Sequence, residues 1–247
     1  MNTLTLVSEP AGELQKLLFV SNGFVSMSEG KESIEQIKIL VLGQSNVGKT
    51  SLINRFATNR YNEERRATIG VDFMTKRIKI NKDITINCTL WDTAGQEKFE
   101  HSIGSAFYRG ADGIILVYDC TYKPSLSQLN SWKGEIQLRC DGEVPTIVIA
   151  NKADLKSDEF DETLDIALEW CREFNFPHLE ASAKDGDGVE AAVLAIAARA
   201  LKAKAYRKSI SNRYSNSITV RDSSGKRNRA SLSMNDMYNP KEKEDCC

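Results

Sequence analysis

One short segment constrains the fold of this chain more than any other: Gly43-Gln44-Ser45-Asn46-Val47-Gly48-Lys49-Thr50, with the spacing G-x-x-x-x-G-K-[ST]. The apolar, β-branched run 37–42 comes directly before it and predicts a strand buried on both faces. Residues 51–56 follow it with a helical pattern. A strand, a glycine-rich turn and a helix N-terminus in this order cradle phosphate, because backbone N–H groups and the helix dipole converge on the anion. We call residues 43–50 the phosphate loop, in which Lys49 would reach the β- and γ-phosphates.

The pattern beyond the phosphate loop alternates strands with helices. Further buried strands are predicted at 113–118 and 146–150, a short strand at 178–181, and helices at 125–138, 161–174 and 188–204. Residues 73–80 and 84–90 flank the turn Asn81-Lys82-Asp83, which predicts a β-hairpin. The pattern therefore predicts an α/β fold with a mostly parallel six-stranded sheet and helices on both faces. In such a sheet, ligands bind at the carboxyl ends of the strands.

The composition divides the 247-residue chain into three parts. Residues 1–36 are net acidic and lack periodicity, residues 37–205 carry the strand and helix pattern, and residues 206–247 are rich in Ser, Asn, Lys and Arg. We expect a flexible amino-terminal extension, one folded domain and a disordered tail. Met27 offers a start shortly before the first strand, so residues 1–26 are expected to be dispensable. The apolar stretch 14–20 leaves open the alternative of a short partner-binding helix.

Charge, hydropathy and cysteine usage exclude several classes of protein. Thirty-three Lys and Arg against 34 Asp and Glu give a net charge of −1, which argues against a nucleic-acid partner. No run approaches the roughly 18 apolar residues of a membrane-spanning helix. Four cysteines are scattered singly, so their spacing predicts neither zinc nor disulfides and is typical of a reducing compartment: Cys88, Cys120, Cys140 and Cys171.

Two later loops indicate which base accompanies the phosphates. Asn151-Lys152-Ala153-Asp154 follows the strand 146–150 at its carboxyl end. The Asp154 carboxylate can accept hydrogen bonds from the ring N–H and the exocyclic amine of guanine, and adenine offers no such pair of adjacent donors. Ser182-Ala183-Lys184 follows the strand 178–181, and a backbone N–H there can bind the guanine carbonyl. The residues therefore predict GTP or GDP as the ligand and disfavour an ATPase or kinase.

The metal and the attacking water have candidate residues of their own. The Thr50 hydroxyl would bind Mg²⁺, and Asp92, in the segment Trp91-Asp92-Thr93-Ala94-Gly95-Gln96, would hold the ion through water. Gly95 would let the backbone approach the γ-phosphate. The neutral amide of Gln96 both donates and accepts hydrogen bonds, which suits a residue that orients water for in-line attack.

Together these segments resemble the Ras-like small GTPases, and within them the Rab proteins. The resemblance spans residues 37–205 and the two terminal cysteines, and its Rab-like parts are 68–73, 91–96, 107–112 and 113–121. It implies the small-G-protein fold of the P-loop NTPases and a switch that hydrolyses GTP slowly and recruits effectors to regulate vesicle traffic. A catalytically silent GTP-binding scaffold is the alternative, and single-turnover hydrolysis of bound GTP distinguishes the two.

The resemblance also assigns roles to individual residues. It implies that Thr68 completes the coordination of Mg²⁺ and that Tyr61 edges the guanine. It implies that three aromatic residues, Phe73, Trp91 and Phe107, form a surface for effectors. The full set expected to contact nucleotide is Gly43, Ser45, Asn46, Val47, Gly48, Lys49, Thr50, Ser51, Tyr61, Thr68, Gly95, Asn151, Lys152, Asp154, Ser182, Ala183 and Lys184.

The last two residues predict how the chain meets a membrane. Cys246-Cys247 resembles the Rab ending that carries two geranylgeranyl groups, and two lipids are what stable anchoring requires. The tail before them is net basic, which favours an anionic leaflet. The expected partners are an exchange factor, a GTPase-activating protein, a GDP-dissociation inhibitor, the prenylation machinery and effectors. We expect a monomer at the cytoplasmic face of endomembranes, with a cytosolic pool.

Overall fold

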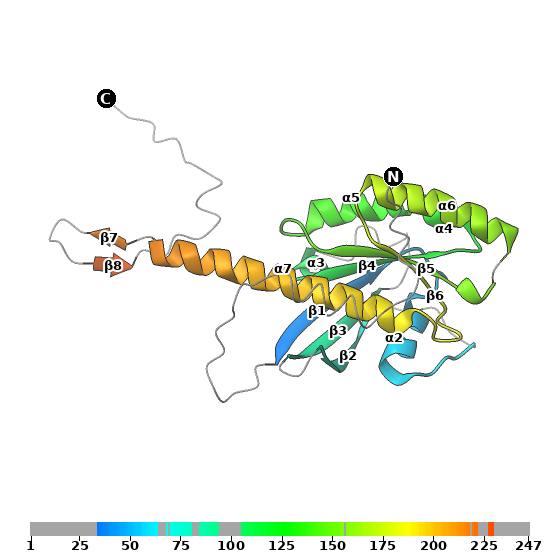
Figure 1. Ribbon diagram of the computed structural model, residues 1–247, viewed down its shortest axis with the longest axis horizontal. Helices are drawn as coiled ribbons and strands as arrows, with labels where there is room; N and C mark the ends of the chain where they lie inside the picture. Colours follow the sequence, from blue (N-terminus) through cyan, green and yellow to red (C-terminus); the bar gives the residue numbers. More distant parts are fainter. Residues whose placement is uncertain are drawn as a thin grey trace, which may run out of the picture. The chain divides into compact units, whose positions relative to one another are not determined.

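The computed structural model describes residues 34–63, 68, 70–80, 84–93, 105–155, 157–217, 219–221 and 227–229. Six strands form one sheet in the order β2-β3-β1-β4-β5-β6 (Figure 1). Their bounds are β1 (Glu35–Leu42), β2 (Val71–Lys79), β3 (Thr85–Thr93), β4 (Gly113–Asp119), β5 (Thr146–Asn151) and β6 (His178–Ala181). The neighbouring pairs are parallel, except that β2 and β3 form an antiparallel hairpin. The predicted mostly parallel sheet and the hairpin are confirmed.

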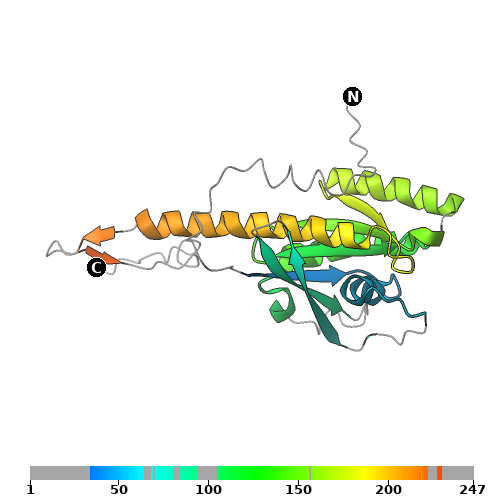
Figure 2. The same ribbon diagram turned by 60° about the horizontal axis from the view of Figure 1, so that its bottom comes forward.

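Successive side chains of the central strands belong to two separate cores, one on each face of the sheet. Ile37, Ile39 and Val41 of β1 pack with α2 (Lys49–Thr58) and with the first turns of α7 (Val189–Ser217). Leu40 and Leu42 pack on the other face. That face is covered by α3 (Ser105–Tyr108), α4 (Lys123–Ser127), α5 (Leu129–Arg139) and α6 (Asp158–Glu173). Figures 1 and 2 show α2 on the opposite side of the sheet from α5 and α6. This two-sided burial explains the continuous apolar runs of β1, β4 and β5.

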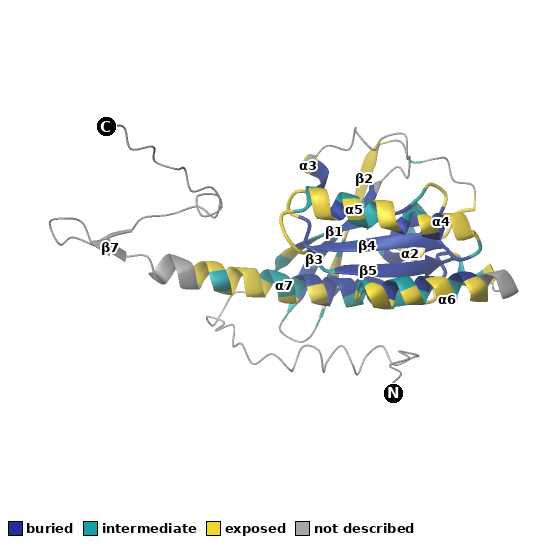
Figure 3. Cartoon of the chain, turned by 90° about the horizontal axis from the view of Figure 1, so that it is seen from above, coloured by how far each residue is buried: buried dark blue, intermediate teal, exposed yellow. Residues whose placement is uncertain are grey.

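The burial pattern separates the centre of the sheet from its edge. Every residue of β4 and β5 is buried, and both strands are dark blue between the helices in Figure 3. β2 is an edge strand, and Val71, Phe73, Arg77 and Lys79 on it are exposed. The well-packed centre fixes the ends of β1, β4 and β5, where the candidate ligand-binding residues lie.

Three helical elements differ from the sequence prediction. The helix expected at 125–138 is two helices, α4 and α5, which meet at Gln128, and Pro124 lies in the first turn of α4. The short helix α3 was not predicted, because four residues show no period. The helix expected at 188–204 runs on to Ser217, through a segment of Ala, Lys and Arg with good helix propensity.

The chain divides into two compact units, residues 1–203 and residues 204–247. In the second unit the structure describes the end of α7 and a small antiparallel pair, β7 (Thr219–Arg221) with β8 (Arg227–Arg229). These elements lie within the stretch 206–247, for which the composition predicts disorder. The extension 1–33 and residues 230–247 lie outside the described residues. Within the described ranges, no helix is long and apolar enough to cross a membrane.

Candidate functional site

The phosphate loop joins β1 to α2, and two of its glycines are required by their neighbours. Gly43 has φ 148°, and a Cβ there would lie 2.2 Å from the carbonyl oxygen of Val117. Gly48 has φ 92°, and a Cβ there would lie 2.3 Å from Nδ2 of Asn151. A larger residue would therefore overlap the backbone of β4 at position 43 and the Asn151 side chain at position 48.

Lys49 lies inside the loop rather than in solvent. Its side chain is 4% exposed, and Nζ donates to the carbonyl oxygens of Gly43 and Gln44, both at 2.8 Å. The loop therefore holds the ammonium at the N-terminus of α2, where the backbone N–H groups and the helix dipole also favour an anion. Ser45 and Asn46 are exposed at the crest of the loop, and Asn46 has φ 67°.

Three oxygen-bearing side chains meet at the first turn of α2. Thr50 Oγ1 donates to Asp92 Oδ2 at 2.5 Å and lies 2.8 Å from Thr68 Oγ1. Asp92 is 3% exposed, and among the described residues its Oδ1 has no hydrogen-bond partner. Burial raises the pKa of Asp92, while the hydrogen bond from Thr50 acts to lower it. Two hydroxyls and a carboxylate with an unpartnered oxygen are a donor set that fits a hard cation such as Mg²⁺.

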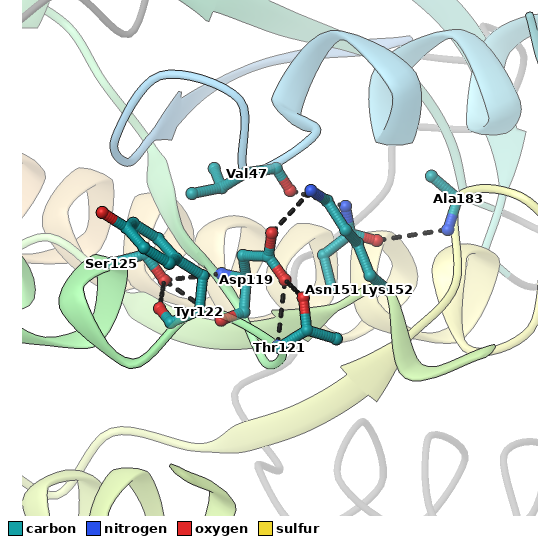
Figure 4. Close-up of polar contacts among 8 residues, drawn as sticks. All are labelled: Val47, Asp119, Thr121, Tyr122, Ser125, Asn151, Lys152 and Ala183. Atoms are coloured by element: carbon teal, nitrogen blue, oxygen red, sulfur yellow. Dashed lines mark hydrogen bonds and ion pairs between the residues drawn. The ribbon is translucent and has the colours of Figure 1, made fainter. Parts of the chain in front are cut away.

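Asn151, at the end of β5, joins the phosphate loop to the loop after β6 (Figure 4). Its Nδ2 donates to the carbonyl oxygen of Val47 at 2.7 Å, and its Oδ1 accepts from the N–H of Ala183 at 3.2 Å. Because both ends of the buried amide are used, the two loops are held in register with each other. Sequence reasoning placed Asn151 against nucleotide; the structure shows that it also braces the site.

Lys152 and Asp154 are each oriented by a neighbour. Lys152 has φ 68°, uncommon for a residue with a Cβ, and its Nζ pairs with Asp119 Oδ2 at 2.5 Å. Asp119 Oδ1 accepts from the N–H and the hydroxyl of Thr121, at 3.0 and 2.7 Å. Ser182 Oγ donates to Asp154 Oδ1 at 2.7 Å, and the N–H of Asp185 donates to the same Ser182 Oγ at 3.0 Å. The described polar residues therefore form one connected edge from the phosphate loop to residue 185.

Comparisons with known proteins agree on the family of this chain. The sequence model of the Ras family matches residues 38–202. Over 199 residues, covering 78% of this chain and 93% of the relative, the sequence is 41% identical to Ras-related protein Rab7 of Drosophila melanogaster. It is 44% identical to Ras-related protein RABG3c of Arabidopsis thaliana, over 67% of this chain and 82% of the relative. It is 39% identical to Ras-related protein Rab-7a of Dictyostelium discoideum, over 67% and 83%.

The chain belongs to the Rab branch of the Ras family. It is therefore a small GTPase, a GTP hydrolase that regulates membrane traffic and associates with endomembranes. Proteins of this family bind GTP and GDP, generally with Mg²⁺.

In this Rab protein the structure brings together the three aromatic residues expected to face effectors. Phe73 stacks on Trp91 with ring centroids 5.5 Å apart, and Phe107 meets Trp91 edge-on at 6.0 Å. Phe73 is 59% exposed, whereas Phe107 is buried. The exposed part of this aromatic group is therefore mainly Phe73, with Trp91 behind it. Tyr61 is exposed after the end of α2. Gly95, Gln96, Cys246 and Cys247 lie outside the described residues.

Sequence reasoning missed several residues of this site in the Rab protein. Asp119 pairs with Lys152, Arg55 contacts the loop after β6, and Lys38 contacts Trp91 and Phe107. The only signal for Asp119 was its place at the carboxyl end of a buried strand. For Arg55 and Lys38 the sequence carried no signal, because their partners are distant in the chain.

Proposed function

We propose that this Rab GTPase binds Mg²⁺ and GTP along the carboxyl edge of its sheet, and that the phosphates lie on the phosphate loop. Guanine would lie between the loops that follow β5 and β6. The observation that carries the proposal is the meeting of Thr50, Thr68 and Asp92 beside Lys49, with one buried Asp92 oxygen that no described residue partners.

The hydroxyls of Thr50 and Thr68 would hold the ion directly, and Asp92 would hold it through water. When bound, the ion supplies positive charge at the β- and γ-phosphates. Thr50 belongs to α2, whereas Thr68 comes from the segment before β2, so only Thr68 depends on the conformation of that segment. This supports a switch in which contacts to the γ-phosphate and its metal order the segment around Thr68 and hydrolysis releases it.

Recognition of the base would fall to Asp154 and to the backbone of residues 182–184. Ser182 holds Asp154 from one side, so the carboxylate is already oriented before it accepts the two guanine donors. Lys152, fixed by Asp119, and the exposed Tyr61 would flank the ring. Lys49 would bind the β- and γ-phosphates, and Gln96 would orient the attacking water.

The remaining parts of the proposal concern partners. We propose an exchange factor, an activating protein, a GDP-dissociation inhibitor and effectors, the last bound at Phe73 and Trp91. Cys246 and Cys247 would carry two lipids added by the prenylation machinery. The net basic tail would support that anchor on an anionic leaflet.

The rate of GDP release, measured with excess Mg²⁺ and again with EDTA, tests the metal site. Parent protein should release GDP more slowly with Mg²⁺, whereas Asp92→Asn should lose most of that dependence because its side chain is neutral. Asp165→Asn is the matched control, since Asp165 is an exposed carboxylate on α6. Equal Mg²⁺ dependence in Asp92→Asn and Asp165→Asn would contradict the assignment. Competition of GTP against ATP tests the base in the same assay.

A further inference from the structure

Arg55 connects the last turn of α2 to the loop that follows β6. Its Nε donates to the carbonyl oxygen of Ala183 at 2.9 Å, and a second guanidinium nitrogen donates to the carbonyl oxygen of Lys184. The third nitrogen donates to the carbonyl oxygen of Asn59 at 3.0 Å, just beyond the end of its own helix. One planar group thus holds three carbonyls from two segments that are more than 120 residues apart in the chain.

The Arg55 side chain also supports the loop by packing. Gly186 has φ 98°, and a Cβ there would lie 3.4 Å from Cδ of Arg55. The loop therefore passes close over the aliphatic part of the arginine before it turns towards α7. Ala183 itself is 3% exposed, so its peptide groups are out of reach of bulk water. Buried hydrogen bonds such as the one to Ala183 hold the position of a backbone segment more tightly than exposed hydrogen bonds do.

Ala183 is held on both of its main-chain polar groups by side chains from other elements. Asn151 accepts from its N–H, and Arg55 donates to its C=O. Asn151 also contacts Val47 in the phosphate loop, and Arg55 belongs to the helix that the phosphate loop begins. Two side chains therefore connect the loop 182–186 to the phosphate-binding half of the site: the buried Asn151 and, closer to the surface, Arg55.

We propose that Arg55 is a positioning residue for the guanine base, which holds the backbone of residues 183–184 at the base and so slows the release of nucleotide. The proposal rests on the guanine site of the proposed function. Arginine suits the task because its rigid fork serves two neighbouring carbonyls at once, which the point charge of lysine does not. Among the described residues, the hydrogen bonds of the Arg55 guanidinium go to Asn59, Ala183 and Lys184 and not to the cluster of Thr50, Thr68 and Asp92, so we expect its effect at the base.

Release of a fluorescent GDP analogue from the full chain, chased with excess GDP and Mg²⁺, tests this. Arg55→Met should release nucleotide roughly tenfold faster, because at least one buried carbonyl loses a charge-assisted donor. Arg55→Lys should recover only part of the difference. Thr58→Ala is the control in the same helical turn, since Thr58 is exposed and its hydroxyl donates to the carbonyl oxygen of Asn54 within α2. It should release nucleotide at the parent rate.

Two further measurements separate positioning from general damage. A non-hydrolysable GTP analogue should be released faster by the same factor as GDP, and single-turnover hydrolysis of GTP already bound should change by less than about twofold. If Arg55 only stabilises the fold, the urea midpoint and the hydrolysis rate should fall together in Arg55→Met and in Arg55→Lys. That result would overturn the proposal. If Arg55→Met fails to fold, Arg55→Lys tests the proposal instead. A parent-like rate of nucleotide release in Arg55→Lys would contradict the proposal.

The same assay distinguishes failure of this inference from failure of the guanine site. If the parent does not prefer GDP to ADP, the base assignment itself is wrong and Arg55 has no base to position. If the parent prefers GDP and Arg55→Met releases it at the parent rate, the guanine site stands and the role of Arg55 is refuted.

Discussion

The Lys38 ammonium lies 4.4 Å from the centroid of the Trp91 ring and donates to the carbonyl oxygen of Phe107 at 2.6 Å. It also donates to the carbonyl oxygen of Arg109 at 2.9 Å, so β1 is tied to the residues at the end of α3. Burial lowers the pKa of Lys38, and the charge of Asp112 opposes that shift. A cation that is partly withdrawn from water thus lies against two of the three aromatic residues proposed to meet effectors.

Replacing Lys38 with Met should lower the free energy of unfolding by about 2 kcal/mol. The variant loses a cation–π contact and leaves two carbonyl oxygens without their donor. Urea denaturation monitored by tryptophan fluorescence measures the loss. Lys79→Met, at an exposed position of β2, is the matched control and should change stability by less than about 0.5 kcal/mol. Equal stability of the two variants would show that the Lys38 contacts contribute little.

Gly43→Ala should abolish nucleotide binding and destabilise the fold by about 3 kcal/mol or more. The added methyl would overlap the carbonyl oxygen of Val117, so either the phosphate loop or β4 must move. Gly134→Ala provides the contrast, because Gly134 lies within α5 and a Cβ there has open space. It should stabilise the protein by up to about 1 kcal/mol. Thermal unfolding of both variants decides the matter; a stable, nucleotide-binding Gly43→Ala protein would contradict the steric argument.

The free energy of unfolding should decrease as the pH is lowered, because the folded state resists protonation of His178. Its Nε2 lies 3.1 Å from the Tyr118 hydroxyl, and burial lowers the pKa of His178 to about 4 from the usual 6.5. The folded state therefore excludes a proton that the unfolded state binds below pH 6.5. This contribution to stability is complete above pH 6.5 and is lost as the pH falls towards 4. From pH 6.5 to 5 the loss should be about 1.5 kcal/mol.

Urea titrations at pH 6.5 and 5 of the parent and of His178→Gln test this. The glutamine variant keeps a polar partner for Tyr118 but does not titrate, so its pH dependence over this range should be smaller by about that amount. An unchanged difference between the two pH values would assign the effect to other groups.

Gln96→Leu should slow intrinsic hydrolysis, since a leucine side chain cannot orient water. The parent rate is expected on the order of 10⁻⁴ s⁻¹, as for small GTPases without an activator. Single-turnover hydrolysis of preloaded GTP is the measurement, and GDP affinity should be unaltered. A variant that hydrolyses GTP at the parent rate would remove Gln96 from the mechanism.

Changing both Cys246 and Cys247 to Ser should release the protein from membranes while GTP binding is retained, because both lipid attachment points are lost. Fractionation of cells that express the tagged full chain measures this. Cys140→Ser, which also removes a thiol but leaves the terminus intact, should pellet like the parent. If the double variant still pellets, the anchor lies elsewhere.

The sequence predicted the parts of this fold that depend on local pattern. Strands such as 146–150 were found because burial on both faces demands a continuous apolar run, and the phosphate loop was found because close contacts of backbone and side chain require its two glycines. The break between α4 and α5 at Gln128 was missed, because both halves keep apolar residues at helical spacing. Arg55 could not be recognised, since an arginine in an amphipathic helix normally faces solvent. Lys38 could not be recognised either, because its partners near residue 107 are distant in the chain.

The edge strand β2 carries a consequence for how copies of the protein behave when they are crowded. Molecules held by the proposed lipid anchor would share a two-dimensional surface, where open sheet edges meet often and invite strand-to-strand aggregation. Exposed Arg77 and Lys79 lie on this edge strand beside Lys76, whose Nζ is held by the carbonyl oxygen of Phe56. Two such edges brought together would place like charges opposite one another. On the proposed membrane anchor, the cationic strand would therefore oppose edge-to-edge pairing of neighbouring molecules.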